Sequence, residues 1–381
     1  VTNTIELNTG NDLDLTGITV MRPDSFSDAL FNVIGDVTIT GGDSGIIDGQ
    51  YAGSAPLITV AETGDLTLEN ITLQNNHNNA TGETKIHGGA INVEGGTLTC
   101  TDVTFSGNRV TYMPGYENSV GNFHGGGAIY AEDADLTVTS SNFSNDTAVY
   151  GSGGAIFVGD GTTALIKDNA FTNCTAEATK ASELRPNDGN GGAIACGDDS
   201  FDSGMNVEIV GNTITGCSAE GNGGGIYVWV DNYNRTPVET LIGCSVTLDG
   251  NNISNCTAGN RGGGMSLYNT VMAYTNESAI SLLSGQITGC EADWGGGIDY
   301  TGHGMNKLQL TNVIITGNEA GNGGGIWACP WAEVETYSTL GGAIYGNTAE
   351  NGDDIFYEGE DSANRTVLTV GSGTNLSREN S

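Results

Sequence analysis

The chain has 381 residues, of which 46 are Asp or Glu and 11 are Lys or Arg, so its formal net charge is -35. A field of this sign repels nucleic acids and anionic lipids, and it excludes both as partners. No apolar run approaches the roughly 20 residues that a membrane-spanning helix needs, so we expect no membrane insertion. Gly is abundant at 61 residues, but the hydrophobic fraction of 37% is high enough for a buried core.

Residues 1–72 contain strand-like segments without a regular motif. Short stretches such as "NTIELN" (3–8), "DVTITGG" (36–42) and "LTLENITL" (66–73) show the two-residue period of half-buried strands. We interpret this region as two or three irregular coils that also form the end cap of a solenoid.

A tetrad, Gly-Gly-(Ala/Gly)-(Ile/Met), recurs along the rest of the chain. It ends at Ile91, Ile129, Ile156, Ile194, Ile226, Met265, Ile298 and Ile326, with a "GDDI" variant at Ile355. A second motif, an apolar residue followed three positions later by Asn, Asp or Cys, alternates with the tetrad. It occurs at Leu73/Asn76, Phe105/Asn108, Phe143/Asp146, Phe171/Cys174, Ile214/Cys217, Ile253/Cys256, Ile287/Cys290, Ile315/Asn318 and Ile344/Asn347. The strict alternation identifies a repeat.

A third strip of apolar residues lies five and seven positions before the apolar residue of the second motif. It includes the pairs Leu98/Cys100, Leu136/Val138, Val207/Ile209 and Leu308/Leu310. Spacing by two is strand periodicity, and no helical period is present. Three short strands in a repeat as short as 28 to 29 residues predict a parallel β-helix of about 11 coils with loop insertions. We expect one domain over 1–381, with irregular coils at 1–72, repeat coils at 73–356 and a last coil or tail at 357–381.

Each motif position has a structural role in such a fold. The glycines suit a tight corner, the tetrad Ile stacks in the core, and Asn at a bend stacks into a ladder. In four consecutive coils the ladder residue is Cys instead: Cys174, Cys217, Cys256 and Cys290. We favour stacked free thiols, since buried Cys behaves as a small hydrophobe. Disulfides Cys174–Cys217 and Cys256–Cys290 are the alternative, because strand spacing of about 4.8 Å is within their reach.

The paired motifs resemble those of the passenger domains of chlamydial polymorphic membrane proteins and of adhesin-like surface proteins from gut bacteria and methanogenic archaea. The literal matches are "GGAI" ending at Ile91, Ile129, Ile156 and Ile194, and "FSGN" at 105–108. The resemblance implies a right-handed parallel β-helix that is secreted, displayed on a cell surface and active in adhesion. The chain departs from the chlamydial pattern in its four Cys positions and in having no C-terminal β-barrel segment. We therefore expect a piece of a larger anchored or exported precursor.

The residue after the tetrad Ile points outward and is often aromatic. Such positions hold Tyr130, Phe157, Tyr227, Trp327 and Phe356, and the segments that follow them add Trp229 and Trp331. Either loops fold over these rings, or the rings form a platform that stacks on glycans or binds protein. We name these seven residues as the candidate ligand-binding set.

An enzyme on the same scaffold is the alternative, because parallel β-helices also carry polysaccharide lyases and hydrolases. The few basic residues are scattered, and the net charge argues against an anionic substrate. A hydrolase needs two carboxylates within about 10 Å, and its candidates are Asp231, Glu239, Asp299 and Glu333. Asp353 and Asp354 in "NGDDI" have either a capping role or a role as calcium ligands.

The sequence thus predicts a non-enzymatic, adhesin-like module at the cell surface. It would bind a host or microbial glycan or protein as a monomer, without a cofactor or with calcium. A glycoside hydrolase or polysaccharide lyase is the alternative. An ice-binding solenoid would need a regular outward Thr array, and the sequence shows no such column.

Overall fold

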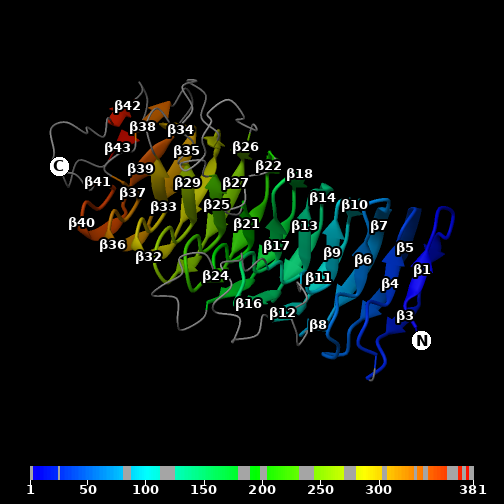
Figure 1. Ribbon diagram of the computed structural model, residues 1–381. Helices are drawn as coiled ribbons and strands as arrows, with labels where there is room; N and C mark the ends of the chain where they lie inside the picture. The colour runs from blue at the N-terminus through cyan, green and yellow to red at the C-terminus, as the bar shows by residue number, and fades with distance from the viewer. Residues whose placement is uncertain are drawn as a thin grey trace, which may run out of the picture.

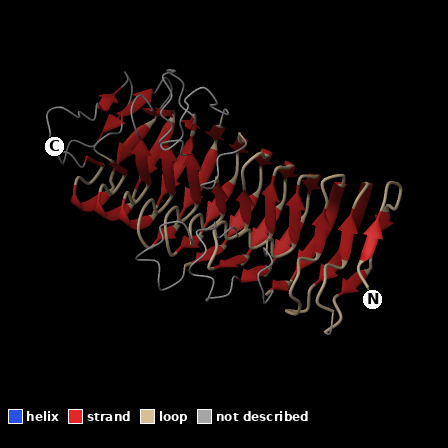
Figure 2. Cartoon of the chain, in the orientation of Figure 1, coloured by secondary structure: helices blue, strands red, loops and turns tan. Residues whose placement is uncertain are grey.

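A computed structural model of the chain describes most of the repeat region. The described residues are 3–24, 26–79, 87–111, 125–178, 189–197, 204–230, 244–269, 280–302, 307–329, 333–337, 342–357, 368–370 and 375–376. Their strands wind into an elongated stack of coils that runs from β1 at one end to β41 at the other (Figure 1). The regular elements among these residues are all strands (Figure 2). No described helix is long and apolar enough to span a bilayer.

Three parallel sheets form the walls of the stack. Sheet A takes one strand from every coil and has twelve, one more coil than the sequence suggested. Its strands are β1 (Ile5–Leu7), β4 (Phe31–Val33), β6 (Ile58–Val60), β9 (Ile91–Glu94), β13 (Ile129–Glu132), β17 (Ile156–Val158), β21 (Ile194–Cys196), β25 (Ile226–Val230), β29 (Met265–Asn269), β33 (Ile298–Gly302), β37 (Ile326–Ala328) and β41 (Ile355–Tyr357). The predicted all-β, parallel β-helical class is therefore confirmed.

Sheet B is bent into two strips, B1 and B2. Strip B1 holds β2 (Leu13–Asp14), β10 (Thr97–Thr101), β14 (Asp135–Thr139), β18 (Thr163–Lys167), β22 (Asn206–Val210), β26 (Ser245–Asp249), β30 (Ile280–Leu282), β34 (Lys307–Thr311), β38 (Glu333–Tyr337) and β42 (Leu368–Val370). Strip B2 holds β3 (Thr19–Met21), β11 (Thr104–Ser106), β15 (Asn142–Ser144), β19 (Ala170–Thr172), β23 (Thr213–Thr215), β27 (Asn251–Ser254), β31 (Gly285–Thr288), β35 (Val313–Thr316), β39 (Ala343–Tyr345) and β43 (Asn375–Leu376). The long strands β5 (Asp36–Asp48) and β7 (Asp65–Gln74) run through both strips and join them.

Sheet C closes each coil from the third onward. It comprises β8 (His77–Asn78), β12 (Arg109–Thr111), β16 (Thr147–Val149), β20 (Thr175–Glu177), β24 (Ser218–Ala219), β28 (Thr257–Ala258), β32 (Glu291–Trp294), β36 (Glu319–Asn322) and β40 (Thr348–Asn351). A typical coil thus has four strands, where the sequence predicted three. The sequence analysis missed sheet C because most of its strands bury only one residue, often a small one such as Ala176 or Ala219, and so show no apolar pair at spacing two.

The core is built from columns of identical or similar side chains. Phe105, Phe143 and Phe171 stack with ring centroids 4.7 Å apart at each step and planes within 9° of parallel. The tetrad Ile residues from Ile91 to Ile326 are buried, as predicted, and Ile355 is partly buried. At the corner before the tetrad Ile, Gly323 has φ +67°, and a Cβ there would collide with the carbonyl oxygen of Ile326. Packing and backbone geometry together account for the motif.

The predicted Asn ladder is present. The Asn108 amide donates to the carbonyl of Leu73 at 3.0 Å and to Asp146 Oδ1 at 3.0 Å, and Asn318 donates in the same way to Ile287 and Asn347. Each of these two side-chain amides therefore donates one hydrogen to the coil before it and one to the coil after it, so both of its hydrogens are bonded.

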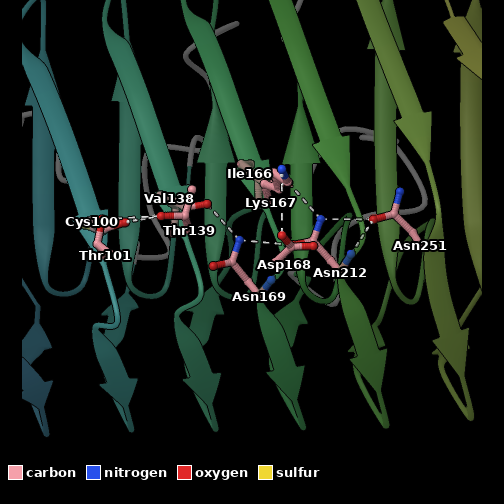
Figure 3. A network of polar contacts seen from close by, with 10 residues as sticks. All are labelled: Cys100, Thr101, Val138, Thr139, Ile166, Lys167, Asp168, Asn169, Asn212 and Asn251. Carbon is pink, nitrogen blue, oxygen red and sulfur yellow. Dashed lines mark hydrogen bonds and ion pairs between the residues drawn. The ribbon is translucent and has the colours of Figure 1, made fainter. Parts of the chain in front are cut away.

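A second ladder lies two positions before the apolar residue of the second motif. Its members are Ser141, Asn169, Asn212 and Asn251. Asn169 and Asn212 each donate to a backbone carbonyl of the preceding coil at 2.9 Å and to the next Asn side chain at 3.0 Å (Figure 3). The sequence analysis missed this ladder because its Asn residues occupy only three coils.

The four ladder cysteines are buried and free. Hydrogen bonds with the thiols of Cys174 and Cys256, together with burial, raise the pKa of Cys217. The column is continuous with the Asn ladder, since the backbone N–H of Cys290 donates to Asn318 Oδ1 at 2.9 Å. The preferred interpretation as stacked thiols agrees with this structure.

The first coils are irregular, as predicted, and one buried cation organises them. The guanidinium of Arg22 donates to the backbone carbonyls of Phe26, Asp28, Ala55 and Pro56, and burial lowers its pKa to about 10. Strands β1, β2 and β3 lie at the outer edge of the stack, and Ile5, Ile18 and Met21 of this coil are exposed. The role of the first coils as an end cap stays a prediction.

Asp146 interrupts the first Asn ladder with a fully buried carboxyl group. Its Oδ1 accepts from Asn108, whereas its Oδ2 has no hydrogen-bond partner among the described residues, and burial raises its pKa to about 7. Its ordinary value is 3.8, so between these pH values the folded protein binds more protons than the unfolded chain. The stabilising contribution is present near pH 4 and is lost as the pH rises through 7.

We therefore expect Asp146→Asn to stabilise the protein at pH 8 by on the order of a few kcal/mol, with the two unfolding temperatures converging toward pH 4. The amide remains neutral and continues the ladder in both directions. Thermal unfolding at pH 4, 6 and 8 checks this. A variant that is less stable than the parent at pH 8 would contradict the buried-carboxyl interpretation.

The cysteine column makes a separate prediction. Unfolded protein should expose the same number of reactive thiols with and without reductant, because the column contains thiols and no disulfide. Titration with a chromogenic disulfide reagent in denaturant measures this number. Four additional thiols after reduction would instead reveal two disulfides, as in the alternative pairs Cys174–Cys217 and Cys256–Cys290.

Candidate functional site

The outward column of sheet A is the first place to look for a site. Strand pairing brings its residues into one row: Tyr130, Phe157, Ala195, Tyr227, Ser266, Asp299, Trp327 and Phe356. Tyr130, Phe157, Tyr227 and Trp327 are at most 8% exposed. Of the two alternatives, burial of the rings agrees with the structure, because side chains this buried have no free face for a glycan.

Local stacking accounts for part of this burial. The ring of Tyr130 lies 4.0 Å from that of His87 and 5.4 Å from that of Phe157, centroid to centroid, with nearly parallel planes. Tyr130, Phe157, Ala195 and Tyr227 form a small apolar cluster separate from the main core, and Trp229 packs against it. The row is a second, external core over this part of sheet A.

The other candidate residues have different outcomes. Trp229 is partly buried and meets Tyr268 edge to face at 5.9 Å, and Phe356 is partly buried against the main core. Trp331, Asp231 and Glu239 lie outside the described residues. Glu333 begins β38 in sheet B, while Asp299 belongs to β33 in sheet A, and the side chain of Glu333 is not among those described.

Asp353 and Asp354 close the end of the ladder. Asp354 Oδ1 accepts from the amide of Asn347 at 3.0 Å, and Asp353 Oδ1 accepts from the backbone N–H of Ala349 at 2.8 Å. Both carboxylates thus act on the chain itself, in keeping with the capping role. Within the described residues there is no group of three or more His, Cys, Asp and Glu side chains placed to hold a metal ion. A calcium role for the pair remains an untested expectation.

A conspicuous polar cluster lies where sheet C turns into sheet A. The residues four positions before the tetrad's last residue form a column: Asn190, Asn222, Arg261, Trp294, Asn322 and Asn351. Asn222 donates to Asn190 at 3.0 Å, and Asn351 donates to Asn322 at 2.9 Å. Arg261 and Trp294 break this amide column in the middle, and the ladder does not require either residue.

Arg261 reaches from this column to the outward row of sheet A. Its guanidinium carbon lies 4.3 Å from the ring centre of Trp327 and 5.2 Å from that of Trp294, within cation–π range. Its Nη1 lies 3.5 Å from Asp299 Oδ1, and Asp299 Oδ2 accepts from Ser266 Oγ at 2.8 Å. The side chain of Arg261 is 31% exposed, whereas that of Asp299 is 4% exposed.

Burial dominates the electrostatics of Asp299. It raises the pKa of this carboxyl to about 6, although the Arg261 charge and the Ser266 hydroxyl oppose the increase. Trp327 is buried beside it, and among the described residues its indole Nε1 has no acceptor. A buried carboxyl that titrates near neutrality, next to an arginine and two indoles, is a possible acid, base or anchor. The sequence analysis found Asp299 and Trp327 but missed Arg261, Ser266 and Trp294, which the interruption of the Asn column could have revealed.

Comparison with known proteins adds no argument about this chain. No family model and no curated protein matches the chain. Among solved structures it is similar to tailspike protein 3 of bacteriophage CBA120, with 12% identity and a TM-score of 0.33. The match covers 99% of this chain and 56% of that protein, so the chain spans about half of its length. At this level of similarity we draw no functional conclusion from the match.

The cluster predicts a measurable titration in the native protein. Because Asp299 lies next to Trp327, tryptophan fluorescence should change with a midpoint near pH 6, the pKa of the buried carboxyl. Asp299→Asn should abolish the transition. Ser266→Ala should move the midpoint above 6, since the Ser266 hydroxyl stabilises the carboxylate. An unchanged titration in Asp299→Asn would show that another group is responsible.

Proposed function

We propose that the chain is a non-enzymatic, adhesin-like binding module that acts outside the cell and recognises a glycan or protein on a host or microbial surface. The proposal is supported mainly by where the insertions enter the scaffold. Segments 231–244, 270–279, 303–306 and 329–332 each connect a strand of sheet A to the following strand of strip B1.

The anchor points of these insertions are neighbours in space. The strands that precede the insertions, β25, β29, β33 and β37, pair consecutively in sheet A. The strands that follow them, β26, β30, β34 and β38, pair consecutively in strip B1. Insertions that follow one another along the chain therefore start and end along a single edge of the stack. Recognition residues are commonly carried on loops held by a rigid scaffold, and these segments contain Tyr233, Tyr274 and Trp331.

Charge narrows the class of partner. The net charge of -35 opposes nucleic acids and anionic membranes and keeps the chain soluble as a monomer. An uncharged glycan or a protein with a basic or neutral surface meets no such barrier. The proposed setting is the cell surface, with this chain forming part of a larger anchored or exported protein.

An enzyme is the second candidate because of the raised pKa of Asp299. A glycoside hydrolase needs a pair of carboxyl groups about 5 to 9.5 Å apart on either side of the bond. Asp299 is buried, with one oxygen bound to Ser266 and the other facing Arg261. Because the chain's own Ser266 and Arg261 engage this carboxyl group, binding explains the cluster better than hydrolysis.

The test uses the purified chain on a glycan array and on intact bacterial and host cells. We expect binding to at least one surface, with no release of reducing ends from the bound polysaccharide. Asp299→Asn serves as the catalytic control and should leave product formation at background. Release of reducing ends that disappears in Asp299→Asn would replace the adhesin proposal with a hydrolase.

A further inference from the structure

The outer face of strip B2 is unlike the rest of the surface. Each strand from β7 to β39 presents two outward residues there, and strand pairing aligns them in two columns. The pairs are Thr72/Gln74, Thr104/Ser106, Asn142/Ser144, Ala170/Thr172, Thr213/Thr215, Asn252/Ser254, Gln286/Thr288, Ile314/Thr316 and Ala343/Tyr345. We call this set the neutral strip, because none of these described side chains carries a charge.

The neighbouring faces of the same coils are charged. Outward residues of strip B1 include Asp65, Glu69, Asp135, Lys167, Glu208 and Asp249, and those of sheet C include Arg109, Glu177, Glu291 and Glu319. In a chain of net charge -35, an uncharged surface that persists along so many coils is a local property of strip B2. The fold does not demand it, since outward positions of a strand tolerate Lys, Asp and Glu on the adjacent strip.

The neutral strip is also open. Its residues are partly or fully exposed except Ala343, in contrast to the buried outward row of sheet A. From β7 to β36, the bends on either side of strip B2 are one or two residues long, as at 102–103, 107–108, 211–212 and 216–217. The long insertions enter at other corners of the coil, so the connections that border this part of the face are short.

Hydroxyl groups dominate one of the two columns. From β11 to β35 its members are Ser106, Ser144, Thr172, Thr215, Ser254, Thr288 and Thr316. Some of them hold each other in place: Ser144 donates to Ser106 at 3.0 Å, and the Thr215 and Ser254 hydroxyls are 3.1 Å apart. The column repeats at the strand spacing of about 4.8 Å. A sheet that repeats one hydrogen-bonding group in this way is preorganised, so a repetitive ligand meets little entropic cost on binding.

We propose that the neutral strip binds an uncharged polysaccharide chain, laid along the axis of the β-helix. The inference deepens the proposed adhesin function by naming the class of receptor and the face that holds it. The absence of charge on the strip favours a neutral ligand, and the surrounding acidic surface repels uronic or sulfated polymers. Ser, Thr, Asn and Gln side chains donate and accept hydrogen bonds, as sugar hydroxyls do.

A single hydrogen bond between a strip residue and a sugar hydroxyl is weak in water, but the strip offers many such bonds along its length. A polymer held at several consecutive coils gains from the high effective concentration of every further contact once the first is made. Tyr345 at one end of the strip is 47% exposed and offers a ring for stacking against a sugar. Long chains should therefore bind more tightly than short oligosaccharides.

Ice is the competing occupant of a flat hydroxyl array. The sequence showed no column of Thr alone, and the structure reveals a mixed Ser/Thr column instead. The other column of the strip contains Thr, Asn, Ala, Gln and Ile in no regular order. The ice lattice is rigid and needs the same group at every repeat of the binding surface. A polysaccharide has rotatable bonds and can adapt to a surface whose groups vary. The irregular chemistry therefore favours the polysaccharide.

The experiment compares two lysine variants on the same sheet. Thr215→Lys places a long hydrated side chain in the middle of the neutral strip, and Thr247→Lys does the same on strip B1, at a position that is also partly exposed. Affinity electrophoresis in gels containing a β-glucan, a mannan, pectate or alginate measures binding to neutral and acidic polymers. Thermal unfolding of both variants verifies that they fold.

We expect the parent chain to bind a neutral polymer, with affinity that does not depend on salt and rises with polymer length. Thr215→Lys should weaken this binding about tenfold or more, and Thr247→Lys should leave it within about twofold. Binding that survives in Thr215→Lys, or that is confined to pectate and alginate, would overturn the strip while leaving the adhesin proposal intact.

Two further outcomes separate the inference from the proposed function. Inhibition of ice recrystallisation that is lost in Thr215→Lys, without glycan binding, would assign the strip to ice and overturn the polysaccharide. Binding to cells but to no polysaccharide would overturn the inference alone. Failure to bind any glycan, cell or extracted surface protein would overturn both.

Discussion

The in-register pairing of parallel strands is the constraint on which the rest of the molecule depends. Each coil hydrogen-bonds to the next with equivalent residues face to face, as in Ile129 over Ile91 and Ile156 over Ile129. A side chain is therefore chosen largely for its ability to pack on a copy of itself about 4.8 Å away. Flat rings, branched aliphatic chains, amides and thiols satisfy this condition, and these are the residues that fill the buried columns.

The polar columns show why amides are suited to this constraint and carboxyls are not. An Asn side chain donates and accepts at once, so a row of them satisfies itself from coil to coil. A carboxylate only accepts, and it fits at the end of a row, where Asp354 receives the amide of Asn347. Asp146 lies inside a row, between Asn108 and the cysteine column, and in the described part of the chain its Oδ2 is left without a partner. Burial then raises its pKa, since the neutral acid is the form that the site tolerates.

Much of this architecture could be predicted from the sequence, because in-register stacking requires similar residues at equivalent positions of successive coils and so produces a visible repeat. The tetrad and the Asn or Cys motif located sheet A, strip B2 and the first ladder. The second ladder at Asn169, Asn212 and Asn251 and the short strands of sheet C were missed, because three amides and single Ala residues leave too little pattern. The burial of Tyr130 and Trp327 could not be predicted either. Strand alternation predicts on which side of the sheet a residue lies, but it does not predict what packs over that side.

The same constraint separates structure from function on the surface. Two kinds of feature have no structural explanation: a residue that breaks a column, and a column whose uniformity the fold does not require. Arg261 and Trp294 are of the first kind, and they contact Asp299 and Trp327 within the buried cluster. The neutral strip is of the second kind, and its hydroxyl and amide groups face solvent. Because hydrogen-bonding groups on a rigid, exposed sheet are accessible to a ligand, the strip is a stronger basis for recognition than the buried cluster.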